Sequence, residues 1–232
     1  MADHPDQNTT FPSNGGQAHG YLALPPAGSG PGLIVIQEWW GLVDHIKDVT
    51  DRFAAEGFVA LAPDLYGGRT THDADEAGQL MQELTVPQAA TDLAGAVDFL
   101  LGHEDVTSET VGAVGFCMGG GFVIVLAAQQ GERISAAVPY YGVGGYDDMD
   151  LSGVRARVLG HFGSEDPMAT PAKVAELDTK LREDAHIEPD LRIHEGAGHA
   201  FFNDENLLGT YDADLATSTW QETLGFLKQH IR

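Results

Sequence analysis

A cysteine between two glycines, where a strand gives way to a helix, constrains this chain more than any other feature. Cys117 is the only cysteine among the 232 residues and stands at the centre of residues 115–119, G-F-C-M-G. The apolar run 110–114 predicts a buried strand, and residues 119–128 predict a helix. Glycines permit a sharp turn here, because a Cβ atom would collide with closely approaching backbone. The pattern therefore places Cys117 at the tip of a strand–helix turn, where the helix dipole favours a thiolate.

Two interpretations of Cys117 are open from this turn alone. Free cysteine is among the most buried residue types, so a lone cysteine in a glycine-rich turn is also consistent with inert packing. Alternatively, G-x-S-x-G between a strand and a helix is the nucleophile position of α/β-hydrolases, with cysteine here in place of serine. That interpretation requires a carboxylate and then a histidine further along the chain.

Both residues follow in the required order. The predicted strand 155–162 runs into a loop that contains Asp166, and the predicted strand 190–194 runs into a glycine-rich loop that contains His199. Open α/β sheets place their sites at the carboxyl ends of strands, which is where both residues fall. A carboxylate would orient the imidazole, and the imidazole would take and return the thiol proton of Cys117.

The remaining histidines have ordinary structural explanations. Within strands, His161 and His194 are expected to be hydrogen-bonded core groups. The others are expected to be solvated or to cap backbone groups on the tail, helices and surface loops: His4, His19, His45, His72, His103, His186 and His230. Only His199 combines a position after a strand with glycine neighbours.

Strands and helices alternate along the whole chain. Apolar runs predict strands at 33–37, 58–62, 110–114, 134–140, 155–162 and 190–194. Amphipathic or capped segments predict helices at 44–56, 74–84, 87–101, 119–128, 171–184 and 211–231. Such alternation predicts an α/β fold with a mostly parallel sheet covered by helices on both faces. We expect a single domain over residues 1–232, with a polar tail at 1–18 and an edge hairpin leading to residue 24.

Charge and composition limit the partners. The chain has 35 acidic and 12 basic residues, a formal net charge of −23, which argues against nucleic acid or an anionic membrane as partner. No run approaches the roughly 18 apolar residues of a membrane span, and the start lacks a signal-peptide pattern, so we expect a cytoplasmic protein. The acidic residues 147–150 lack calcium-loop spacing, and neither a metal nor a cofactor is expected.

Six stretches in order resemble the dienelactone hydrolase (carboxymethylenebutenolidase) family of the α/β-hydrolase superfamily. They are residues 34–41, 62–66, 114–120, 140–144, 163–166 and 196–201. The resemblance spans nearly the whole chain and implies that Cys117, Asp166 and His199 form the family's triad. A small-molecule lactone or ester would then be the substrate.

The resemblance also implies roles around the nucleophile. Glu38 would help to deprotonate Cys117 when substrate enters, although a carboxylate at the end of a strand is also explained by anchoring a loop. The backbone N–H groups of Trp39 and Met118 fit the oxyanion-hole positions, one on the loop after strand 33–37 and one directly after the nucleophile.

The chain departs from the family where the carboxylate of dienelactone is held. Family members that act on this lactone use two arginines, one of which would fall at Asn203 and the other within residues 73–84, which contain no Lys or Arg. Arg69 is the only cation nearby and would have to fold inward. An apolar pocket is expected instead from aromatic residues: Trp39, Trp40, Tyr66, Tyr141 and Phe201.

Three functions are compatible with these features. The favoured one is a cysteine-triad hydrolase that forms an acyl-enzyme from a lactone or small carboxylic ester. An acyltransferase of the same fold and a non-catalytic thiol sensor are the alternatives. Catalysis is favoured because a merely reactive thiol would need neither Asp166 nor His199.

Overall fold

The computed structural model describes residues 7–13, 15–145 and 149–232, which form an eight-stranded sheet flanked by helices. The strands are β1 (Thr9–Ser13), β2 (Gly16–Ala23), β3 (Gly30–Ile36), β4 (Val59–Pro63), β5 (Val106–Phe116), β6 (Ile134–Tyr140), β7 (Arg157–Gly163) and β8 (Asp190–His194). The helices are α1 (Asp44–Ala55), α2 (Ala74–Glu83), α3 (Val86–Leu101), α4 (Met118–Gln130), α5 (Pro171–Asp184) and α6 (Ala213–His230).

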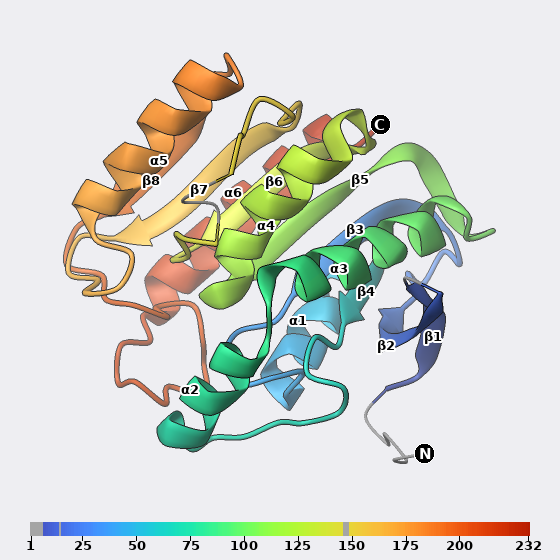
Figure 1. Ribbon diagram of the computed structural model, residues 1–232, viewed down its shortest axis with the longest axis horizontal. Coiled ribbons are helices and arrows are strands. Elements are labelled where there is room, and N and C mark those ends of the chain that lie inside the picture. Colours follow the sequence, from blue (N-terminus) through green and yellow to red (C-terminus); the bar gives the residue numbers. More distant parts are fainter. Residues whose placement is uncertain (1–6, 14, 146–148) are drawn as a thin grey trace.

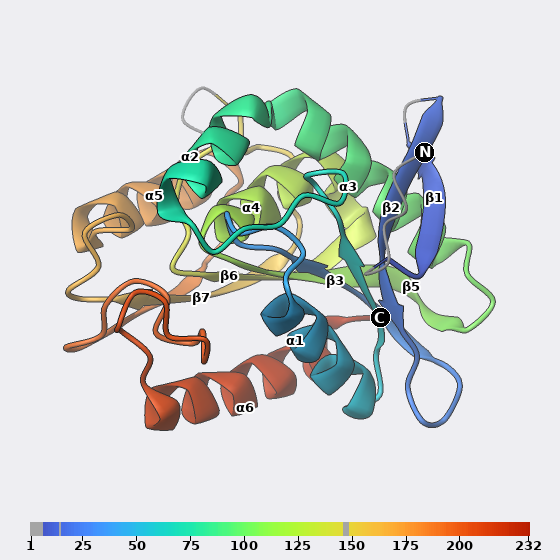
Figure 2. The same ribbon diagram turned by 90° about the horizontal axis from the view of Figure 1, so that it is seen from below.

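The strand order is β1-β2-β4-β3-β5-β6-β7-β8, with β1 and β8 at opposite edges (Figure 1). The strands from β4 to β8 run parallel, and only β1 and β2 are antiparallel to their neighbours. Helices α2, α3, α4 and α5 cover one face, whereas α1 and α6 cover the other (Figure 2). The predicted mostly parallel sheet with helices on both faces is therefore confirmed.

Each face of the sheet buries its own apolar layer. The layer under α3, α4 and α5 includes Leu93, Ile124 and Val174, and the layer under α1 and α6 includes Phe53 and Trp220. The central strands are buried and mostly apolar toward their carboxyl ends, because both faces of the sheet are covered there. Parallel pairing places the carboxyl ends of β3, β5, β6, β7 and β8 at one edge.

In the N-terminal segment the expected edge hairpin is present as β1 and β2, but it begins earlier than expected. Residues 9–13 lie within the stretch 1–18 expected as a polar tail, yet they form β1 and pair with β2. Phe11 is buried, its ring centroid lies 5.8 Å from that of Phe99, and the Ser13 hydroxyl donates to Asp92 on α3. Alternate residues of this short strand thus face inward, a signal weakened by the polar residues around it.

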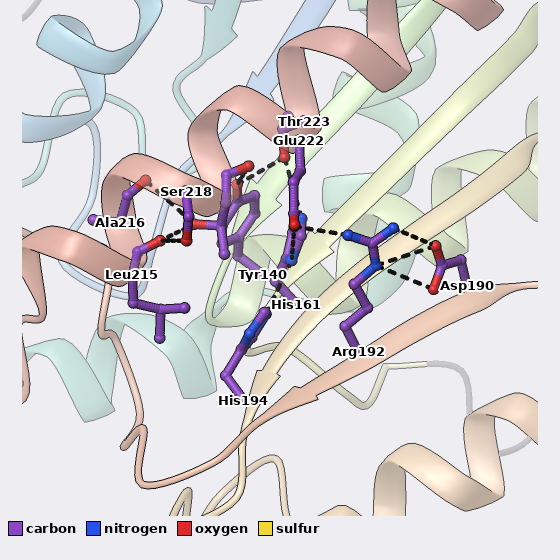
Figure 3. A network of polar contacts seen from close by, with 11 residues as sticks. Tyr140, His161, Asp190, Arg192, His194, Leu215, Ala216, Ser218, Glu222 and Thr223 are labelled. Atoms are coloured by element: carbon purple, nitrogen blue, oxygen red, sulfur yellow. Dashed lines mark hydrogen bonds and ion pairs between the residues drawn. The ribbon is translucent and has the colours of Figure 1, made fainter.

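A chain of polar contacts crosses the buried face between the sheet and α6 (Figure 3). His161 on β7 is fully buried, with its Nδ1 3.1 Å from His194 Nε2 and its Nε2 3.4 Å from Thr223 Oγ1. The Tyr140 hydroxyl contacts Thr223 Oγ1 at 2.7 Å and donates to the Thr219 carbonyl at 2.9 Å. His161 is thus the hydrogen-bonded core group that its strand position predicted, whereas His194 is only half-buried.

Burial, together with the charges of His194 and Arg192, lowers the pKa of His161 to about 3. Because the folded-state pKa is below the value of an unfolded histidine, the neutral ring stabilises the fold above about pH 6.5. As the pH falls below that value, His161 is protonated in the unfolded chain but stays neutral in the folded protein. The free energy of unfolding should therefore fall by up to about 1.4 kcal/mol per pH unit for this proton.

We expect His161→Gln to remove much of this slope, measured as the urea-unfolding free energy across about pH 7 to pH 5. His72→Gln is the matched control, because the His72 side chain is 55% exposed. Equal slopes in the wild-type protein and in His161→Gln would contradict this assignment.

Candidate active site

Cys117 occupies a strained turn between β5 and α4. Its backbone angles are φ 53° and ψ −118°, in a region that non-glycine residues rarely adopt. A Cβ atom on Gly115 would lie 2.2 Å from the Gly119 carbonyl oxygen, and one on Gly119 would lie 2.4 Å from the Ile36 carbonyl oxygen. Glycine is therefore required at both positions by contact with backbone, as the sequence indicated.

Five neighbouring strands each deliver a polar side chain to the same edge. Glu38 follows β3, Cys117 follows β5, Tyr141 follows β6, Asp166 follows β7 and His199 comes after β8. A cavity of about 260 Å3 opens at this edge and is lined by Cys117, Tyr141 and His199. The parallel sheet thus brings together residues that are distant along the chain.

His199 and Asp166 form a buried pair. His199 Nδ1 lies 2.8 Å from Asp166 Oδ2, and Asp166 Oδ1 accepts hydrogen bonds from the N–H groups of Met168 at 2.7 Å and Ala169 at 2.9 Å. Burial opposes the charged form of His199, but its hydrogen bond to Asp166 and its interaction with Cys117 outweigh burial and raise the pKa of His199. Burial likewise opposes the Asp166 carboxylate, but the bonds from His199 and the two N–H groups lower the pKa of Asp166. The pair therefore favours imidazolium beside carboxylate.

The neighbouring acid does not take part in this contact. Glu165 is exposed and lines a separate hollow with Gly198 and Tyr211, outside the cavity that contains Cys117. The tight turn after β7, in which Asp166 N–H donates to the Gly163 carbonyl, points the two consecutive carboxyl groups in different directions.

Glu38 is buried at the end of β3. Its Oε1 accepts from the Tyr141 hydroxyl at 3.1 Å and its Oε2 accepts from Asn203 Nδ2 at 2.5 Å. Burial raises the pKa of Glu38, although the charge of His45 and the bond from Asn203 oppose the rise. Two neutral donors thus partly compensate a carboxyl group that is removed from water.

Trp39 and Met118 lie on two backbone segments in close contact. The Met118 N–H belongs to the first turn of α4, where N–H groups lack intrahelical acceptors. Trp39 follows Glu38 directly, on the loop after β3. Gly119 packs against the carbonyl oxygens of Ile36 and Gln37, which brings the beginning of α4 against the end of β3.

Most of the aromatic residues expected in the pocket do not line the cavity. Trp40, Tyr66 and Phe201 are buried and do not line the cavity. Trp40 packs in the apolar layer under α1 and α6, the Tyr66 hydroxyl donates to Met118 Sδ at 3.4 Å, and the Phe201 ring lies 5.3 Å from that of Tyr141. Of the five expected aromatic residues only Tyr141 is among the residues that line this cavity, and Trp39 is not among them either. Their contact with a substrate stays a prediction.

The two polar residues considered for an anion site also point elsewhere. Arg69 Nη2 lies 2.8 Å from Glu83 Oε2 and its side chain is 55% exposed, so its loop does not fold inward. The Asn203 amide is occupied by Glu38, and its Oδ1 accepts from the N–H of Glu205. Neither lines the cavity.

Apolar residues that the sequence analysis did not single out line the cavity instead: Met81, Phe122, Val143 and Met168. Lys173, in the first turn of α5, is the lining cation, and its Nζ donates to the Met168 carbonyl at 3.0 Å. Among the described residues no Asp or Glu lines this cavity, despite the net charge of −23. The sequence signal that could have placed Met168 and Lys173 at the cavity is their closeness to Asp166 along the chain.

One histidine assigned to the surface is buried. His45 on α1 is 4% exposed, and its Nδ1 lies 2.9 Å from Asp204 Oδ1. The expectation of a solvated or capping histidine is wrong because the His45 side of α1 faces Phe116 and Phe202 rather than solvent. A position in the first turn of a helix does not by itself reveal which face is covered.

Neither a metal-binding cluster nor a membrane-spanning helix is found among the described residues. In residues 7–13, 15–145 and 149–232, no group of three or more His, Cys, Asp or Glu side chains is arranged to hold a metal ion. Asp147 and Asp148, whose spacing argued against a calcium loop, lie outside the described residues. No helix in the described part of the chain combines the length and apolar character needed to cross a membrane.

Known proteins resemble this chain over nearly its full length. A family model described as the dienelactone hydrolase family matches residues 18–231. The protein usf of Aquifex pyrophilus is 33% identical over 231 residues, covering 97% of this chain and 99% of that protein. A Synechocystis protein assigned as a carboxymethylenebutenolidase is 32% identical, with 96% of each chain covered. The crystal structure of a Klebsiella pneumoniae protein assigned as a dienelactone hydrolase matches with a TM-score of 0.84 at 29% identity, covering 95% of this chain and 97% of that one.

Sheet topology and these likenesses define a hydrolase of the α/β-hydrolase fold that acts on ester or lactone bonds. The chain belongs to the dienelactone hydrolase family.

Proposed function

We propose that this enzyme cleaves a lactone or small carboxylic ester through a Cys117–Asp166–His199 triad and an acyl-enzyme. The observation that carries the proposal is the 2.8 Å contact between His199 Nδ1 and Asp166 Oδ2, buried at the cavity that Cys117 also lines. A carboxylate on Nδ1 fixes the imidazole tautomer and leaves Nε2 for proton transfer. No group other than Cys117 competes for His199 Nε2 among the described residues, and the interaction with Cys117 that raises the pKa of His199 supports this role.

The reaction would proceed in two halves. The Cys117 thiolate attacks the carbonyl carbon, and the N–H groups of Trp39 and Met118 stabilise the oxyanion. As the carbon–oxygen bond breaks, imidazolium His199 gives its proton to the leaving oxygen, and a thioester remains. Water then attacks the thioester while His199 takes a proton from the water. Loss of the acid leaves the Cys117 thiolate, which takes back its proton from Glu38, and His199 is again imidazolium.

Glu38 is proposed to assist formation of the thiolate. The Glu38 carboxyl group accepts a hydrogen bond from Tyr141, and Tyr141 lines the same cavity as Cys117. The charge of Cys117 is among the influences that raise the pKa of Tyr141, which supports the closeness of the two residues. When substrate enters, Glu38 in its carboxylate form would take the Cys117 proton, so the thiol would stay neutral and protected from oxidation until then.

Two alternatives remain testable with the same protein. An acyltransferase would pass the acyl group to an added alcohol, so transesterified product would accumulate faster than free acid. A thiol sensor would be modified by electrophiles without turning over any ester. The buried Asp166–His199 pair favours the hydrolase, because thiol modification alone does not need it.

Cys117→Ala should abolish ester hydrolysis and leave the fold intact, because the change removes one sulfur atom from a partly exposed turn. A panel of esters and lactones, assayed before and after iodoacetamide treatment, measures the loss, and circular dichroism checks folding. Cys117→Ser should be severely impaired, since a hydroxyl has a far higher pKa than a thiol. Wild-type rates in Cys117→Ala would refute the triad.

Asp166→Asn should lower kcat/KM by about 100-fold or more, because the amide no longer holds His199 in the required tautomer. Glu165→Gln is the matched control, one residue away and exposed, and should change kcat/KM by less than about twofold. The reverse pattern would mean that the carboxylate is misassigned by one residue.

Neutral short-chain esters or uncharged lactones should be better substrates than dienelactone at low ionic strength. Each missing charge-assisted bond is worth roughly 1.5–3 kcal/mol, so two lower kcat/KM roughly a hundredfold or more. The net charge of −23 also slows the encounter with an anion, an effect that added salt relieves. Efficient dienelactone turnover at low salt would contradict this prediction, and its loss in Lys173→Met but not in Arg69→Ala would locate the anion site at Lys173.

A further inference from the structure

A second histidine–aspartate pair, His45 and Asp204, does not line the cavity. His45 comes from the first turn of α1, and its imidazole is 1% exposed, whereas the Asp204 carboxylate is 55% exposed. The ring makes edge contacts with Phe116, at a centroid distance of 6.5 Å, and with Phe202, at 6.4 Å. Its Nδ1 is taken by Asp204, and its Nε2 is buried without a hydrogen-bond partner among the described residues. A buried, orphaned ring nitrogen is costly and calls for an explanation.

We propose that His45, held by Asp204, is a positioning residue that favours the carboxylate form of Glu38 and thereby sets the lower pH limit of activity. The inference rests on the proposed role of Glu38 as the group that helps to deprotonate Cys117. His45 acts through Glu38 and touches neither substrate nor the reacting atoms.

Asp204 is linked to Glu38 through its neighbour in the chain, Asn203. Asp204, which contacts His45, directly follows Asn203, whose Nδ2 donates to Glu38 Oε2 at 2.5 Å. The Asn203 side chain is oriented by the Glu205 N–H, which donates to its Oδ1 at 2.9 Å. The contact with His45 therefore fastens to α1 the segment that presents Asn203 to Glu38.

The groups around Glu38 leave His45 as its available counter-charge. Tyr141, after β6, and Asn203, before α6, are neutral donors. His199 is the other nearby cation, but Asp166 and Cys117 already share its charge. Among the groups that oppose the rise of the Glu38 pKa on burial, the charge of His45 has the largest effect. His45 therefore acts on Glu38 in two ways, through its charge and through the segment that holds Asn203 against the carboxylate.

The test is the pH dependence of kcat/KM for one neutral ester, because its acid limb reports ionisable groups of the free enzyme. His45→Gln removes the imidazole while keeping a polar side chain. Asp204→Asn keeps His45 but removes the carboxylate that contacts its Nδ1, and it changes only a half-exposed residue should His45→Gln fail to fold. His72→Gln is the control: His72 lies 3.4 Å from Glu205, on the same segment as Asp204, and its side chain is 55% exposed.

In His45→Gln the acid limb should move to higher pH by about one pH unit, as expected for loss of a nearby opposite charge. Below the limb this lowers kcat/KM about tenfold, while the plateau at higher pH changes little. Asp204→Asn should move the limb in the same direction by a smaller amount, and His72→Gln should leave it in place. A merely structural role would lower the plateau without moving the limb.

Glu38→Gln separates the two proposals. If it removes or moves the acid limb while His45→Gln and Asp204→Asn leave the limb unchanged, the role of His45 is refuted and that of Glu38 stands. If Glu38→Gln itself leaves the limb unchanged, the proposed role of Glu38 is refuted. In the double variant with Glu38→Gln, His45→Gln should produce no further movement of the limb, because the group on which it acts is gone.

Discussion

The contact between the first turn of α4 and the end of β3 is the constraint on which the site depends. Gly119 lies so close to the carbonyl oxygens of Ile36 and Gln37 that no side chain fits between them. This contact forces the unusual backbone of Cys117 and brings the segment that begins at Glu38 beside the nucleophile. The burial of both sheet faces supplies the rigidity that holds such strain in place.

The site contains two buried carboxyl groups with opposite tendencies. Asp166 accepts from two backbone N–H groups and contacts an imidazole, so its pKa is lowered despite burial. Glu38 has two neutral side-chain donors and less direct cationic support, so burial dominates and its pKa is raised. Environment, rather than residue type, therefore suits one acid to a permanent charge and the other to exchange of a proton.

The surface and the cavity have different electrostatic characters. A net charge of −23 surrounds the molecule with a potential that repels anions. Within the described residues, however, the cavity wall has Lys173 and His199 but no acid. Apolar side chains from α2, α4 and the loop before α5 make up much of the remaining wall, which suits a small substrate with limited charge.

The sequence by itself determined the alternating α/β plan, the sharp turn at Cys117 and the loop positions of Asp166 and His199. These follow from local periodicity, from glycine spacing and from the rule that parallel strands end at one edge. Only the tertiary structure decided which side chains line the cavity, that β1 forms within the expected tail, and that His45 is buried against Asp204. Trp40, Tyr66 and Phe201 are aromatic residues of the kind that often line pockets, yet they are buried beside the cavity and do not line it. Which face of a segment is covered depends on contacts with elements far away in the chain, and those contacts leave no local pattern in the sequence.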